Sequence, residues 1–196
     1  MNIDAKIQIW QTFAAETGGQ LTIEPHWQTP KLVINFEHWQ LIFDIYATEG
    51  VHGNTLTRVR IPFINKRKFY FSLYHQDIFS EIGKLLGMQD IEIDYPEFDS
   101  SFVIKSNDKA TIKALLARRE ICRLLLTNAD LCFEIRDNEG YRGPTFPANI
   151  DELYLYAVEA VADIARLRVF AQLCCETLTQ LCLIGVASAE TTTFIL

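Results

Sequence analysis

Residues 150–184 read IDELYLYAVEAVADIARLRVFAQLCCETLTQLCLI, the most regular stretch of the chain, and it contains neither proline nor glycine. Its apolar residues recur with gaps that alternate between three and four positions: Ile150, Leu153, Ala157, Ala160, Ile164, Leu167, Ala171, Cys174, Leu178 and Leu181. This heptad spacing places them on one face of a helix. We therefore expect a long carboxy-terminal helix over residues 150–184, about 50 Å long at 1.5 Å per residue.

The apolar stripe on this helix must pack against another surface, and the sequence leaves three arrangements possible. The helix packs into the core of its own domain, pairs with a second copy of the chain, or offers a groove to a foreign helix. Alanine at several stripe positions favours close approach between helices. The candidate interface of a homodimer comprises Leu153, Ala157, Ala160, Ile164, Leu167 and Ala171.

The rest of the chain predicts blocks of helices and strands. Residues 4–17 show helical periodicity and end at Gly18-Gly19, a preferred stop. Strands are expected over 32–36, 39–47, 55–63, 69–74, 90–94, 98–104, 131–136 and 141–146, and helices over 78–86, 108–116 and 120–126. We expect one α+β domain, 1–196, in which an antiparallel meander packs against helices, with 1–88 as a possible sub-lobe.

Composition and charge narrow the class of protein. The 196 residues are 49% hydrophobic and 22% charged, as in globular proteins. The net charge of −7 argues against binding to double-stranded nucleic acid or an anionic membrane. The amino terminus lacks the pattern of a secretory signal, and the five cysteines form no Cys-x-x-Cys pair. We expect a cytoplasmic protein with reduced thiols and no cofactor.

An acidic run between two apolar segments is the strongest indication of chemistry. Five carboxylates fall within ten residues, at Asp90, Glu92, Asp94, Glu97 and Asp99. Alternate side chains of a strand share a face, and carboxylate oxygens at that spacing suit Mg²⁺ or Ca²⁺. The alternative is a charged strand edge that resists aggregation.

Other patterns give weaker indications. His38 and His52 would meet across a hairpin, with Asp44 as a third member, but no metal-binding histidine motif occurs. Neither a Gly-x-Ser-x-Gly elbow nor a phosphate-binding glycine loop is present. The basic turn at residues 66–68 precedes aromatic residues 69–71, a pattern typical of single-strand nucleic-acid surfaces or of a charged hairpin tip with its rings inside.

The segment IEID at residues 91–94, followed by FDSSFVIKSND at 98–108, resembles a segment of an uncharacterised bacterial protein family. In that family an acidic β segment precedes Phe-Asp-x-x-Phe, a hydrophobic strand and a capped helix. The resemblance extends over residues 70–135 and implies a domain shape without an activity. From the residues themselves we expect Phe98 and Phe102 to anchor the core, and Asp99 to accept hydrogen bonds from nearby backbone amides.

These patterns predict a non-catalytic protein-interaction or oligomerisation module that forms a homodimer through residues 150–184. The alternative is a metal-assisted hydrolase or a small-molecule binder that uses the acidic segment 90–99.

Overall fold

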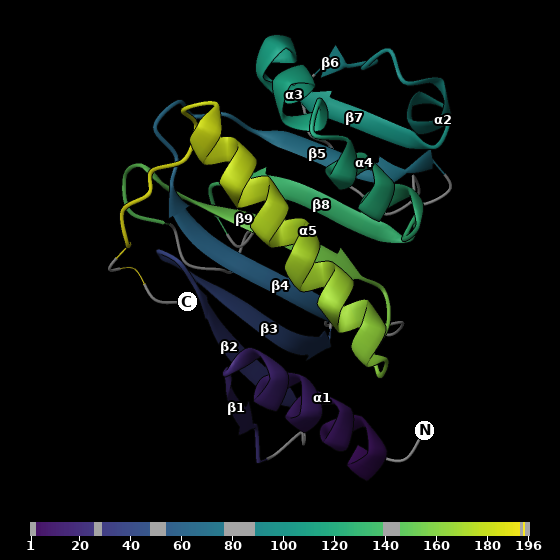
Figure 1. Cartoon of the computed structure of the whole chain (residues 1–196), viewed down its shortest axis with the longest axis vertical. Coiled ribbons are helices and arrows are strands. Elements are labelled where there is room, and N and C mark those ends of the chain that lie inside the picture. Colours follow the sequence, from purple (N-terminus) through teal and green to yellow (C-terminus); the bar gives the residue numbers. More distant parts are fainter. Residues whose placement is uncertain are drawn as a thin grey trace.

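The computed structural model describes residues 3–25, 29–47, 54–76, 89–138, 146–192 and 194, and it confirms the α+β class (Figure 1). The described strands form one antiparallel sheet in the order β1-β2-β3-β4-β9-β8-β5-β7-β6. The strands are β1 (Gln20–Ile23), β2 (Pro30–Phe36), β3 (Trp39–Ala47), β4 (Thr55–Ile64), β5 (Phe71–His75), β6 (Gln89–Asp90), β7 (Phe102–Ser106), β8 (Leu131–Arg136) and β9 (Ile150–Ala157). The helices are α1 (Ile3–Thr17), α2 (Pro96–Asp99), α3 (Lys109–Leu116), α4 (Arg119–Leu126) and α5 (Ile164–Leu183).

Several helix ends lie where the sequence predicts them. Gly18, with φ of 65°, follows the last residue of α1 in the left-handed conformation that glycine adopts easily. Asp108 caps α3, because its carboxylate accepts from the amides of Ala110 and Thr111 at 3.0 Å each. The predicted helix 78–86 and strand 141–146 fall wholly or largely outside the described residues.

The carboxy-terminal helix is present, but its predicted start at residue 150 is wrong. Residues Ile150–Ala157 form strand β9, and α5 begins at Ile164 after a cap in which Asp163 accepts from Ala165 N at 3.0 Å. Strand β9 lies in the centre of the sheet, and most of its side chains are buried on both faces. Because both faces are buried, apolar and aromatic residues follow one another over residues 153–157, which weakens the period of two that marks a half-exposed strand.

The predicted meander holds for β2 to β4, and β1, a strand that the sequence did not predict, extends it at the edge. Strand β5 does not pair with β4 across the basic turn, because β9 and β8 lie between them. At about 4.8 Å per strand the chain crosses about 14 Å here, which the six residues 65–70 span easily. Residues 1–88 therefore do not form a separate sheet: β4 pairs with β9, and β5 pairs with β8.

The described helices cover one face of the sheet. In Figure 1, α5 crosses the middle strands, α1 lies at the β1 end, and α2, α3 and α4 lie towards β6. Together they bury a single core that includes Trp10, Phe43, Phe63, Leu155 and Phe170. The apolar side of α5 thus packs into the core of its own domain, which is the first of the three arrangements that the sequence left possible.

Candidate binding site: the polar face of the sheet and the hairpin pocket

The opposite face of the sheet carries charged and aromatic side chains in cross-strand rows. Asp44, Arg58, Tyr156 and Cys132 form one row across β3, β4, β9 and β8. Further members follow from the same register, and we name the whole set the polar sheet face: Asp44, Tyr46, Arg58, Arg60, Cys132, Glu134, Arg136, Glu152, Tyr154 and Tyr156.

Ion pairs tie this face together. The Asp44 carboxylate accepts from Arg58 Nε at 2.7 Å and Arg58 Nη2 at 2.9 Å, and also from Arg60 Nη2 at 2.7 Å. Arg136 Nε donates to Glu152 at 2.6 Å. All five side chains are buried or half-buried, so these ion pairs replace part of the water that would otherwise solvate each charge.

Aromatic rings lie beside the arginines. The Arg136 guanidinium lies 3.5 Å from the centroid of Tyr154, and that of Arg58 lies 4.1 Å from the centroid of Tyr46. Both distances fall in the range of cation–π attraction. Tyr46 is 41% exposed, which makes it the most accessible ring of the polar sheet face.

Burial shifts several titrating groups on this face. It raises the pKa of Glu134 above its usual value, although the nearby Arg136 charge opposes the shift. Burial also raises the pKa of the Cys132 thiol to about 11, while a hydrogen bond with Tyr156 lowers it. The pKa values of Tyr154 and Tyr156 are raised by burial as well. These groups stay protonated further up the pH scale than they would in water.

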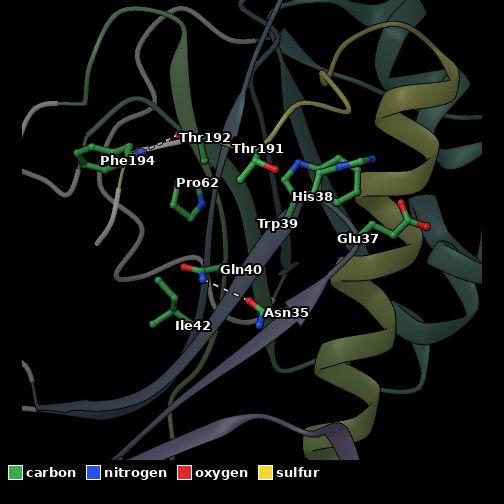
Figure 2. Close-up of a pocket in the computed structure, with 10 residues that line it drawn as sticks. All are labelled: Asn35, Glu37, His38, Trp39, Gln40, Ile42, Pro62, Thr191, Thr192 and Phe194. Carbon is green, nitrogen blue, oxygen red and sulfur yellow. Dashed lines mark hydrogen bonds between the residues drawn. The ribbon is translucent and has the colours of Figure 1, made fainter.

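A second feature is a pocket of about 250 Å³ beside the β2–β3 turn, which we call the hairpin pocket (Figure 2). Its lining comes from the end of β2, the turn, the start of β3, one residue of β4 and the carboxy-terminal segment. The lining residues are Asn35, Glu37, His38, Trp39, Gln40, Ile42, Pro62, Thr191, Thr192 and Phe194.

The predicted acidic metal site is not assembled. Strand β6 ends at Asp90, and Asp94 has a left-handed φ of 60°, so the expected strand 90–94 is wrong beyond its first residue. Asp90 pairs with Lys105, and Asp94 pairs with Lys113. Glu92 and Glu97 are exposed. Within the described ranges, no group of three or more His, Cys, Asp or Glu side chains is arranged to hold a metal ion.

Asp99 has the local role that the sequence predicts. Its carboxylate accepts from the amides of Ile93 and Tyr95 at 2.9 Å each, which fixes the turn before α2. Phe98 and Phe102 stack with ring centroids 4.8 Å apart and are buried in the core. The acidic segment thus stabilises a turn.

The other candidate residues are also dispersed. His38 lines the hairpin pocket, whereas Asp44 lies six residues further along and pairs with two arginines; His52 falls outside the described residues. In the basic turn, Lys68 pairs with the buried Asp151, and the rings of Phe69 and Phe71 are buried. The inward orientation of these two rings is confirmed, but the expected hairpin is wrong, because β9 and β8 lie between β4 and β5.

The six predicted interface residues do not share one helix face. Leu153 and Ala157 belong to β9 and are buried, and Ala160 lies in the connection to α5. Leu167 is buried, which leaves Ile164 and Ala171 partly accessible on α5. The neighbouring exposed positions make pairs within the chain, such as Arg168 with Glu16.

Sequence reasoning missed the polar sheet face, although a signal was present. Arg58 and Arg60 alternate along one strand, and Glu152, Tyr154 and Tyr156 alternate along another. Alternation marks residues that share a sheet face. Only the strand order, which no local pattern contains, brings the two sets together.

No known family model matches the sequence, and no curated protein matches it significantly. In the part of the chain that the structure describes, no helix is long and apolar enough to cross a membrane. The fold is similar to the crystal structure of the mycobacterial trehalose monomycolate transport factor A, TtfA, with a TM-score of 0.55 and 8% sequence identity. The match covers 90% of this chain and 94% of that chain, and at this identity it shows a shared fold alone.

Proposed function

We propose that this protein is a non-catalytic interaction module whose partner-binding surface is the polar sheet face. The observation that carries the proposal is the Arg58 guanidinium beside the ring of Tyr46, because this ring is 41% exposed and can reach a partner. Arg136 over Tyr154 repeats the arrangement at a buried ring. Tyrosine and arginine are enriched in the energetically important parts of protein interfaces.

The state of the reactive groups supports a binding role. Asp44 and Glu152 are engaged by arginines, as structural ion pairs are. Burial raises the pKa of the Cys122 thiol to about 11 and that of Cys175 to about 12, which keeps both thiols in their poorly nucleophilic protonated form.

A second copy of the chain is the simplest partner. Both signs of charge occur among the partly accessible side chains of the polar sheet face, namely Arg58, Arg136 and Glu134. A two-fold interface brings one patch against itself, so it requires a patch that contains both signs. We therefore propose a homodimer through this face, while the stripe of α5 packs into the core.

The comparisons and the composition are compatible with this proposal. The structural neighbour is named as a transport factor, and a non-catalytic role here agrees with that name. The net charge of −7 and the free thiols suit a cytoplasmic protein.

Light scattering over a concentration series tests the proposal. We expect a dimer for the wild-type protein, a monomer for Tyr46→Glu, and an unchanged dimer for the matched control Ala171→Glu on α5. Tyr46 is 41% exposed, so its replacement should leave the circular dichroism spectrum intact. A monomer at every concentration would overturn the dimer. Dissociation by Ala171→Glu alone would return the interface to α5.

A further inference from the structure

We propose that the hairpin pocket binds a small, uncharged, polyhydroxylated ligand, such as a single sugar ring or a short polyol. The inference goes beyond the proposed function, because the pocket uses none of the side chains that define the polar sheet face, although Ile42 and Pro62 adjoin it. Four properties of the pocket restrict the ligands that it can bind: its size, its polar lining, its charge and its apolar walls.

The volume sets the size of the ligand. At about 30 Å³ per molecule of liquid water, a pocket of about 250 Å³ holds roughly eight waters. Sites for drug-sized ligands start at about 300 Å³. A single ring fits this space, whereas a dinucleotide or a long acyl chain does not.

The polar lining consists of groups that both donate and accept hydrogen bonds. The carboxamides of Asn35 and Gln40 are exposed and hydrogen-bonded to each other, with Gln40 Nε2 donating to Asn35 Oδ1 at 3.2 Å. Thr191 and Thr192 add hydroxyl groups on the opposite side in Figure 2. A sugar hydroxyl also donates and accepts, so amides and hydroxyls are its natural partners.

The charge of the lining selects against ions. Glu37 contributes a carboxylate, but Figure 2 shows its side chain directed towards α5 and away from the other lining groups. In agreement, its charge raises the pKa of Cys175 and of Cys182 on that helix, after the larger effect of burial. None of the ten lining residues is a lysine or an arginine, so the lining holds no permanent cation to replace the hydration of an anionic ligand; His38 is the one lining side chain that can take up a positive charge.

Apolar groups complete the walls. Ile42 and Pro62 come from neighbouring central strands, and Phe194 adds an aromatic ring. The C–H face of a sugar ring is apolar and packs well against such surfaces. Trp39 also lines the pocket, and its buried Nε1–H has no acceptor among the described residues; a ligand oxygen within reach would satisfy this donor.

Saturation-transfer NMR on the intact protein tests the inference, with glucose, myo-inositol and glycerol as neutral probes and glucose 6-phosphate as a charged one. We expect saturation transfer to at least one ring-shaped neutral probe and a weaker signal for the phosphate. Gln40→Ala removes an exposed amide and should weaken binding about tenfold, as the loss of one good hydrogen bond predicts. The matched control Gln172→Ala removes an amide that binds Glu120 on the helical side, and should bind as wild type does.

Two results would overturn the inference. One is the absence of transfer to every neutral probe at millimolar concentration, and the other is equal binding by Gln40→Ala and wild type. Either result would leave the oligomeric state unchanged, so it is distinguishable from a failure of the proposed interaction module.

Discussion

Replacing Asp44 by asparagine removes a negative charge that Arg58 and Arg60 share on the polar sheet face. Asparagine has nearly the same shape and keeps one acceptor oxygen, so packing is preserved while the charge is lost. In the wild-type protein the carboxylate receives three hydrogen bonds of 2.7–2.9 Å from the two guanidinium groups. The substitution leaves two half-buried cations with a weaker acceptor.

The magnitude follows from burial. Asp44 is 8% exposed, and Arg60 is 7% exposed. Removing one partner of a buried ion pair costs about 3–5 kcal/mol, and the retained oxygen places Asp44→Asn near the lower limit, at about 3 kcal/mol. A domain of this size loses about 2–4 °C of melting temperature per kcal/mol, so we expect a fall of roughly 6–12 °C.

Calorimetry or thermal melting followed by circular dichroism measures this fall, and Asp94→Asn is the control. Asp94 pairs with Lys113 at 2.6 Å, but its side chain is 85% exposed. Because water and salt screen that pair, we expect no measurable change in the control. If Asp44→Asn melts within about 2 °C of wild type, burial does not set the strength of these pairs and the reasoning is wrong.

Three further outcomes follow from the contacts and pKa shifts. Asp108→Ala should cost about 1 kcal/mol through loss of the α3 cap in urea denaturation. Hydrogen bonds from the Thr111 hydroxyl and backbone lower the pKa of Asp108, so the cap's contribution is present above the usual value of 3.8 and lost as pH falls through the folded pKa. Burial raises the pKa of Glu134, so its ionisation opposes folding: the stability is complete below the usual value of 4.5 and falls as pH rises through the folded pKa. Glu134→Gln should therefore raise the melting temperature at pH 8 and leave it unchanged at pH 4; an equal gain at both would refute this. A thiol reagent followed by mass spectrometry should modify the half-buried Cys182 before the fully buried Cys174, and the reverse order would contradict the burial pattern.

The sequence predicted a helix end correctly where a residue of special chemistry, such as a glycine stop or an aspartate cap, stands at that end. Gly18 ends α1, and Asp108 starts α3 through two backbone hydrogen bonds. The turn at Asp99 was also predictable, because a carboxylate near free amides satisfies them locally. In each case the information lies within a few residues.

The boundary between β9 and α5 has a weaker marker. The connection after the strand begins with Val158 and the half-buried Glu159 and Ala160, and it contains neither proline nor glycine. By coincidence, Ala157 and Ile164 lie seven positions apart and so continue the heptad spacing across this connection. Asp163 is a good cap, and the Tyr-Leu-Tyr run at residues 154–156 favours a strand. Weighing these two signals against the spacing would have separated the elements.

The polar sheet face and the hairpin pocket depend on strand order, which sequence patterns do not encode. Asp44 reaches Arg60 because β3 pairs with β4, and Glu134 reaches Tyr154 because β9 lies beside β8. The pocket joins a turn near residue 37 to residues 191, 192 and 194, more than 150 positions apart. Patterns in a single sequence do not predict which residues so far apart in the chain come into contact.

The polar sheet face is not what stability alone would select. Replacing buried ion pairs by apolar residues of similar volume is often neutral or stabilising, so Asp44 with Arg58 and Arg60 is not the most stable solution for central strands. Solubility would be met by exposed lysine and glutamate, without arginine and tyrosine held in fixed geometry. Arginine and tyrosine that are already ordered lose little side-chain entropy when a partner binds, which strengthens association. The Arg136–Tyr154 and Arg58–Tyr46 pairs are ordered in this way, and such pre-organisation is what the proposed interaction module would need.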